Sequence, residues 1–145
     1  MTSKQIDTKA ESTAAEQLVV AELGLRGLLS GIYPRSFPDV DVFAFDRDIE
    51  KIVKIQVKYR HAAGASYAEF RSGSLGPVDF VVLIRANQGE AVGGRKDVRQ
   101  IWVLPSAEVD ILLKRGPGKD RITFSTIADR WLAAWDVIVE YAKHG

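Results

Sequence analysis

The strongest constraint on the fold is a nearly continuous run of apolar residues, Val78-Asp-Phe-Val-Val-Leu-Ile84. A strand this apolar is typical of the centre of a sheet that is covered on both faces. A chain of 145 residues corresponds to one domain and buries a sizeable core without the help of disulfides, which are excluded because the sequence has no cysteine. The run therefore predicts a central strand in a single domain.

Helix and strand signals alternate around this run. A helix is expected to begin near Thr13, because Thr13-Ala-Ala-Glu16 fits a capping box. Residues 1–12 are predicted to be a flexible N-terminal lead-in and residues 13–145 a single domain. The order of signals predicts an α/β fold with a mixed β-sheet flanked by helices. The expected elements are a helix to about Gly27, a loop at 31–38, a hairpin of strands 39–45 and 51–59, strands at 78–84 and 101–104, a helix at 106–115 capped by Ser106, a short strand at 122–125 and a helix from about Thr126 to Lys143.

Composition narrows the chemistry. The absence of cysteine excludes thiolate zinc sites and cysteine nucleophiles. With only His61 and His144, a histidine-rich metal cluster or a two-histidine mechanism has little material to work with. The remaining carboxylate and amide oxygens suit hard ions such as magnesium. A net charge of +1 gives no global attraction to nucleic acid, so any such surface must come from local clusters. The sequence shows no secretory signal and no membrane-spanning run, which predicts a cytoplasmic protein.

The predicted hairpin gathers polar side chains that suit phosphodiester hydrolysis. Gln56 and Lys58 point to the same face of the second strand, and antiparallel pairing brings Asp41 beside them. Glu16 lies on a helix that must pack on this sheet. Asp41, Glu16 and Gln56 offer oxygens to a divalent metal, which would lower the pKa of a bound water. Lys58 would orient the attacking water and stabilise charge on the phosphate.

Two stretches carry a family resemblance. Pro38-Asp-Val-Asp41, an apolar strand and Ile55-Gln-Val-Lys58 together resemble the PD-(D/E)XK nuclease signature. The helix Glu16-Gln-Leu-Val-Val-Ala-Glu-Leu-Gly24 is similar to the helix that precedes this signature in the family. The motifs cover roughly residues 13–60, and the later strands look similar to small stand-alone bacterial and homing-endonuclease members.

The resemblance implies a restriction endonuclease-like core and cleavage of DNA, double-stranded or branched, that depends on Mg²⁺ or Mn²⁺. It implies that Asp41 and Glu16 are metal acids, that Gln56 occupies the (D/E) position and that Lys58 is the signature lysine. Most members have a carboxylate where this chain has Gln56, although a Q-x-K subset is known in the family. The missing negative charge is expected to weaken metal affinity.

Alternatives stay open for each of these residues. Asp39 directly follows proline and is a second candidate for the metal acid, although Asp41 precedes the apolar strand that the family shows. Glu16 also fits a capping-box acid. Gln56 and Lys58 also fit an exposed strand face, where lysine prevents aggregation.

Basic and polar residues outside the hairpin are candidates for DNA contacts. Because cutting two strands needs two sites, we expect a homodimer or a higher even oligomer. The alternative to an enzyme is a catalytically decayed fold that serves as a DNA-binding, assembly or accessory module. The candidate DNA contacts are Arg35, Ser36, Arg60, Arg95, Lys96, Lys114, Arg115 and Lys119.

Overall fold

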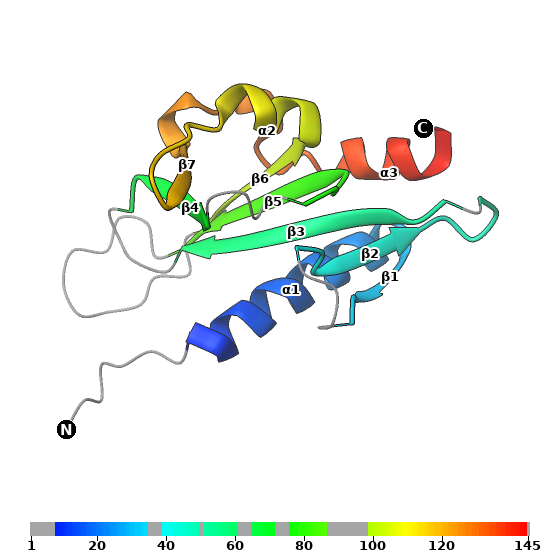
Figure 1. Cartoon of the computed structure of the whole chain (residues 1–145). Coiled ribbons are helices and arrows are strands. Elements are labelled where there is room, and N and C mark those ends of the chain that lie inside the picture. The colour runs from blue at the N-terminus through cyan, green and yellow to red at the C-terminus, as the bar shows by residue number, and fades with distance from the viewer. Residues whose placement is uncertain are drawn as a thin grey trace.

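A five-stranded mixed sheet forms the centre of the protein (Figure 1). The computed structural model describes residues 8–34, 39–49, 51–60, 65–71, 76–86 and 99–144. β3 and β5 pair in parallel, and the other neighbouring strands pair antiparallel, as predicted for a mixed sheet. In spatial order the strands are β1 (Leu29–Ile32), β2 (Val42–Phe45), β3 (Val53–Arg60), β5 (Phe80–Arg85) and β6 (Gln100–Pro105).

The apolar run predicted to be central forms β5, between β3 and β6. Val81, Val82 and Leu83 are fully buried, because both faces of the strand are covered. Their alternating side chains enter two separate cores, one on each face of the sheet. The central strand is therefore confirmed.

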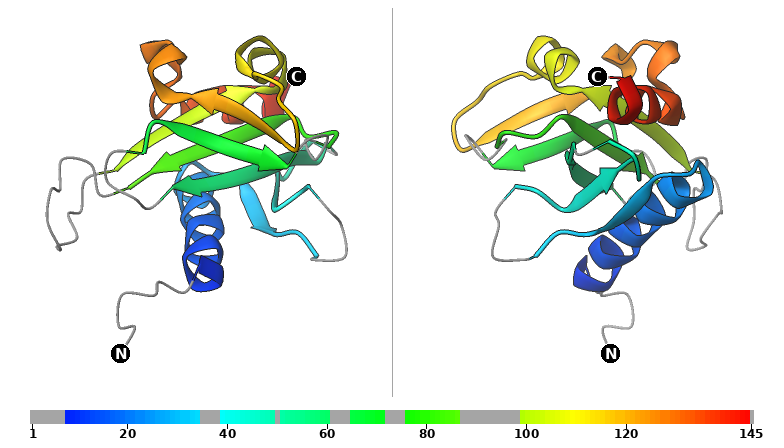
Figure 2. Two further views of the ribbon diagram at one scale, coloured as in Figure 1. Left: turned by 60° about the vertical axis from the view of Figure 1, so that its left-hand side comes forward. Right: turned by 90° about the vertical axis from the view of Figure 1, so that its right-hand side faces the viewer.

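Helices cover one face of the sheet. α1 (Thr8–Leu25) and α3 (Trp135–His144) pack through Val19, Leu23 and Ile138 against the sheet. Figure 2 shows α1 below the sheet, with its N-terminal end furthest from the strands. No helix within the described ranges is long and apolar enough to span a membrane.

The opposite face is covered by a short helix and a separate two-stranded ribbon. The helix is α2 (Ser106–Leu112), and the ribbon pairs β4 (Tyr67–Arg71) with β7 (Lys119–Thr123) in antiparallel fashion. Phe70 and Ile122 of the ribbon pack on the sheet side that carries Leu83. Two short 3₁₀ helices, η1 (Phe124–Thr126) and η2 (Asp129–Trp131), follow β7.

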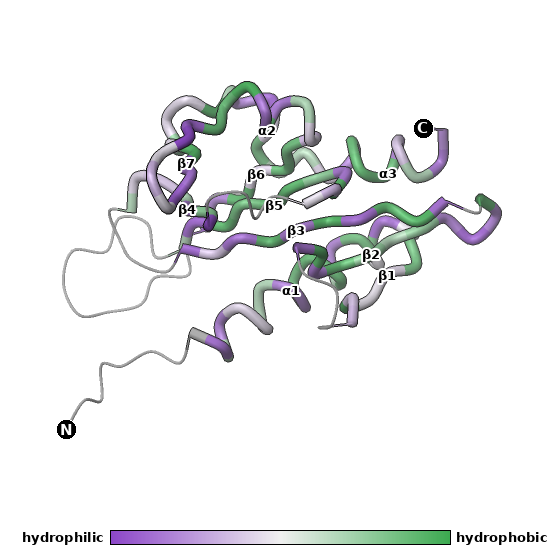
Figure 3. Tube along the Cα trace, viewed as in Figure 1, coloured by the Kyte–Doolittle hydropathy of each residue, from purple (hydrophilic) through white to green (hydrophobic). Residues whose placement is uncertain are grey.

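The predicted hairpin is confirmed by the pairing of β2 with β3, in which Val42 lies opposite Ile55. Its turn begins with Asp46, whose Oδ2 accepts a hydrogen bond from the Asp48 N–H at 3.3 Å. Figure 3 shows that this turn is mostly hydrophilic, although it also contains the exposed apolar residues Ile49 and Ile52.

The predicted N-terminal caps of α1 and α2 are both wrong. α1 begins at Thr8 rather than Thr13, so Thr13 and Glu16 lie inside the helix and do not form its capping box. Lys9, Ala10 and Glu11 have high helix propensity, which extends the helix backwards. The N-cap of α2 is Pro105, and no side chain caps it, so the predicted cap at Ser106 is also wrong.

Two further elements differ from the prediction. Residues 29–32 form β1, where Gly31 lets the ring of Phe43 come within 2.9 Å of the position a Cβ would take. The last helix begins at Trp135 rather than near Thr126, because the chain first forms η1 and η2 and turns at Ala133 with φ +50°. Trp131 and Trp135 consequently pack into opposite cores.

Candidate active site

The candidate site lies where β2 begins and β3 extends beyond it, paired there with β5. β2 starts at Val42, whereas β3 extends to Arg60. The Val57 N–H donates a hydrogen bond to Oδ2 of Asp41 at 2.8 Å, and the Asp41 N–H donates to the carbonyl of Ile55 at 2.9 Å. The Asp41 carboxylate is thus anchored to β3 just beyond the end of the hairpin ladder.

Gln56 lies between Ile55 and Val57 on β3 and is almost completely buried, with 5% of its surface exposed. This burial contradicts the alternative that it belongs to an exposed strand face. Within the described part of the chain, its Oε1 has no hydrogen-bond partner. A buried acceptor without a partner is costly, so it calls for a donor or a cation from outside the protein.

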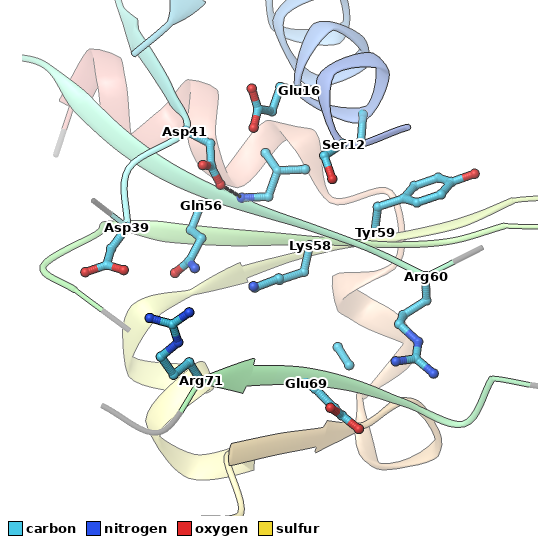
Figure 4. Close-up of a pocket in the computed structure, with 13 residues that line it drawn as sticks. Ser12, Glu16, Asp39, Asp41, Gln56, Lys58, Tyr59, Arg60, Glu69 and Arg71 are labelled. Atoms are coloured by element: carbon cyan, nitrogen blue, oxygen red, sulfur yellow. Dashed lines mark hydrogen bonds between the residues drawn. The ribbon is translucent and has the colours of Figure 1, made fainter. Parts of the chain in front are cut away.

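Lys58 lies two residues further along the same face of β3. Its Nζ is 5.4 Å from the centroid of the Phe70 ring, which belongs to β4. Figure 4 shows the Lys58 side chain extending over the pocket toward Gln56. The lysine therefore places its ammonium between the central sheet and the ribbon.

Side chains from four segments line a single pocket of about 510 Å³. It contains all four residues predicted to be catalytic, and it also contains Asp39. The structure thus brings together a helix acid, a strand-end acid and two side chains of β3. The polar and charged lining residues are Ser12, Glu16, Asp39, Asp41, Gln56, Lys58, Tyr59, Arg60, Glu69 and Arg71.

The charges in this pocket are arranged by sign. The carboxylates of Glu16 and Asp41 lie on the α1 and β2 side, whereas the cations of Lys58 and Arg71 lie toward the ribbon (Figure 4). Arg71 was not among the predicted site residues. Glu69, two residues before it on β4, is paired with cations of β7 instead. The pocket accordingly places the carboxylates of Glu16 and Asp41 opposite the cations of Lys58 and Arg71.

Asp39 shares the pocket with Asp41 but is held differently. Its backbone is in the left-handed region, with φ +71°. A Cβ at Gly76 would lie only 2.8 Å from the Cβ of Asp39, so a glycine is needed for this close approach. Both aspartates remain candidates for the metal acid, and Asp41 is the one hydrogen-bonded to β3.

The donor set of the pocket fits a hard divalent cation. No group of three or more histidine, aspartate and glutamate side chains close enough to hold a metal occurs in the part of the chain that the structure describes. Glu16, Asp41 and Gln56 offer two carboxylates and one amide oxygen instead. Magnesium and manganese prefer such oxygen ligands, and a cation would satisfy the buried Oε1 of Gln56.

The candidate DNA contacts separate into three groups. Arg60 lies at the pocket. Lys114, Arg115 and Lys119 line another groove together with Arg121, which belongs to the same basic cluster of the sequence. Tyr67, which no sequence motif indicated, also lines this groove. The remaining predicted contacts, Arg35, Ser36, Arg95 and Lys96, lie outside the described residues, as does His61.

No protein-family model matches the chain, and no curated protein matches it. Solved structures match its fold. The bacterial homing endonuclease I-Ssp6803I superposes with a TM-score of 0.58 at 16% sequence identity, over 94% of this chain and 96% of that one. The Holliday junction resolvase Hjc of Archaeoglobus fulgidus has a TM-score of 0.49 at 16% identity, over 79% and 85%. The predicted restriction endonuclease-like fold class is confirmed.

Proposed function

We propose that this protein is a divalent-metal-dependent nuclease that hydrolyses phosphodiester bonds in DNA. The observation that carries the proposal is the buried, unpartnered Oε1 of Gln56 next to the strand-anchored carboxylate of Asp41. The full-length likeness in fold to a protein described as a homing endonuclease supports the same conclusion.

In this proposal Asp41, Glu16 and Gln56 hold Mg²⁺ or Mn²⁺. Such an ion would lower the pKa of a coordinated water and offset the charge of the phosphate. Gln56 contributes a neutral ligand where a carboxylate would bind the ion more strongly. We therefore expect weak metal affinity and activity at millimolar rather than micromolar metal.

Lys58 and Arg71 act on the phosphate from the ribbon side of the pocket. Lys58 orients the attacking water through its ammonium, which has three donors and no acceptor. Arg71 presents a planar fork that matches two phosphate oxygens. Together they stabilise the negative charge that develops as the new bond to phosphorus forms.

Cleavage of supercoiled plasmid and of a branched DNA, each with Mg²⁺ and with Mn²⁺, tests the proposal. Wild type is compared with Asp41→Ala, Lys58→Ala and the control Lys54→Ala, with folding checked by circular dichroism. Lys54 is a matched control because it lies on the same face of β3 as Lys58 but does not line the pocket. We expect wild type and the control to cut and the other two variants not to cut.

Two results would overturn the proposal. One is cleavage by Asp41→Ala or Lys58→Ala at the rate of wild type. The other is a wild type that binds DNA but cuts neither substrate with either metal, which would favour a decayed DNA-binding module.

A dimer or higher even oligomer remains part of the proposal for two-strand cutting. Light scattering of the protein with and without DNA measures it, and a strict monomer in both conditions would exclude it.

A further inference from the structure

The outer face of the β4–β7 ribbon is strongly charged. Alternation along β4 turns Ala68 and Phe70 into the core, which leaves Tyr67, Glu69 and Arg71 on the outside. The partner strand β7 buries its alternate residues Asp120 and Ile122 in the same way. Its outward residues are Lys119, Arg121 and Thr123.

Cations gather on this face of the ribbon. Lys119 and Arg121 of β7 both pair with the Glu69 carboxylate, at 2.9 and 3.8 Å. The hydrogen bond from Lys119 lowers the pKa of Glu69 below its ordinary value. One carboxylate cannot neutralise Lys119, Arg121 and the neighbouring Lys114, and the surplus positive charge attracts polyanions.

Part of this face forms a groove of about 490 Å³, and hydrogen bonds hold the backbone that lines it. Lys114 and Arg121 exchange two main-chain hydrogen bonds, at 2.8 and 2.9 Å, which attaches the segment after α2 to β7. The buried Asp120 accepts a hydrogen bond from the Gly116 N–H at 3.4 Å and lies 3.7 Å from Arg115. The lysine and arginine side chains therefore project from an anchored backbone.

The groove is connected to the candidate active site by direct contacts. Tyr67 lines the groove, and the guanidinium carbons of Arg60 and Arg121 lie 5.3 and 4.5 Å from its ring centroid. Arg60 and Glu69 also line the active-site pocket. Figure 4 shows Arg60 and Glu69 at the same side of that pocket. A strand that occupies the pocket can continue over the ribbon past Arg60, Tyr67 and Arg121.

We propose that the groove is a second nucleic-acid subsite, which binds the backbone phosphates of the DNA strand beyond the scissile bond. Lys114, Lys119 and Arg121 make the phosphate contacts, and Tyr67 holds the guanidinium groups in place. The subsite extends the proposed nuclease function. It rests on that function because the path of the DNA strand is taken to run from the proposed active site to the groove. Because these contacts go to phosphates, they supply affinity independent of sequence.

Binding without cleavage tests the subsite. The dissociation constant of a labelled DNA duplex is measured in EDTA by fluorescence anisotropy across a salt series. Wild type is compared with the triple variant Lys114→Gln/Lys119→Gln/Arg121→Gln. Each lost phosphate contact reduces the slope of log K against log salt by about 0.9 for duplex DNA, so we expect a reduction of about 2–3.

The matched control is Arg47→Gln/Arg130→Gln/Lys143→Gln. It removes the same charge from exposed residues that line neither the pocket nor the groove. The single variant Arg121→Gln guards against misfolding of the triple variant, and it is expected to reduce the slope by about 0.9. The control triple is expected to keep the wild-type slope.

The outcomes separate the subsite from the nuclease proposal. Equal slopes for wild type and the groove variants, equal losses in the control triple, or no DNA binding by wild type would overturn the subsite. Preferential binding of RNA would overturn its assignment to DNA. A groove-dependent slope in a protein that cuts nothing would support the subsite and contradict the nuclease proposal.

Discussion

The Asp41 carboxylate accepts the Val57 N–H at 2.8 Å, at the point where β3 continues past the end of β2. One carboxylate oxygen therefore completes the hydrogen bonding of the sheet. The carboxylate also lines the pocket, together with Gln56 and Lys58. The hydrogen bond gives this side chain a structural role, and substitutions can separate that role from the metal-binding role proposed for it.

Asp41→Asn is expected to fold with nearly the stability of wild type, because the amide oxygen still accepts the Val57 N–H. Asp41→Ala leaves that N–H without its partner and is expected to lower the free energy of unfolding by about 1–3 kcal/mol. Both variants should lose the rise in melting temperature that Mn²⁺ gives wild type. Urea denaturation and thermal shift measure the two effects, and an Asn variant that keeps the Mn²⁺ response would place the metal acid elsewhere, with Asp39 next to be tested.

Gln56→Glu adds a carboxylate at a position with 5% exposure. Without metal, the buried charge is expected to lower the melting temperature and to raise the pKa of the new carboxyl. With Mn²⁺, the same charge should strengthen metal binding, so the gain in melting temperature exceeds that of wild type. Gln56→Met, which keeps the length but removes the oxygen, serves as the control and should show no gain. A Glu variant that is insensitive to metal would remove Gln56 from the ligand set.

Arg71→Ala is expected to lower kcat by about 10²–10³, which is typical when a donor to a charged transition state is lost. Arg71→Lys should recover only part of the rate, since lysine lacks the planar fork. The affinity for uncut DNA in EDTA should change much less than kcat. Arg130→Ala is the control, because Arg130 lies outside the pocket. Full activity of Arg71→Ala would show that this arginine does not contact the reacting phosphate.

Tyr141→Phe tests the attachment of α3 to the sheet. The Tyr141 hydroxyl donates to Oδ1 of Asp79 at 3.1 Å, while Oδ2 of Asp79 accepts the Lys54 N–H at 2.8 Å. Loss of this hydrogen bond to a charged group is expected to cost about 1–3 kcal/mol at pH 7. The Phe ring keeps the contact with Phe80. Urea denaturation at neutral pH measures the cost.

The hydrogen bond between Tyr141 and Asp79 also predicts how the free energy of unfolding depends on pH. Burial, and then the hydrogen bond to Asp79, raise the pKa of Tyr141 above its ordinary value of 10.0. The stabilisation is therefore complete below pH 10 and is lost as the pH rises through the raised pKa. The difference in unfolding free energy between wild type and Tyr141→Phe should shrink over that alkaline range. A difference that stays constant would mean that the hydroxyl does not titrate in the folded protein as this geometry requires.

The parts of the fold that the sequence predicted well have strong local patterns. The run Val78–Ile84 and the alternation in residues 51–59 specify strands without knowledge of their partners. β1 and β4 escaped prediction because they are short and lie next to glycine, alanine and serine, and their pairing depends on distant strands. Local propensity cannot identify such elements, since their stability comes from tertiary contacts.

The candidate site divides in the same way. Asp41, Gln56 and Lys58 belong to one hairpin, so their convergence follows from turn length and strand alternation. Arg71, Tyr67 and Arg121 enter through the ribbon, whose docking on the central sheet depends on the buried faces of β4 and β7. The convergence of the hairpin residues was therefore predictable from short-range pattern. The basic residues were recognisable as candidates for DNA contacts, but their position beside the pocket was not predictable.

The start of β2 at Val42 has a consequence for how such a site arises or disappears. If β2 paired with β3 over two more residues, a main-chain carbonyl would accept the Val57 N–H, and Asp41 would become an ordinary ladder position. The strand order and both cores would be unchanged. The length of one strand would then decide whether the same fold presents this carboxylate in the pocket, so the point where the strand begins is more informative about the site than overall similarity.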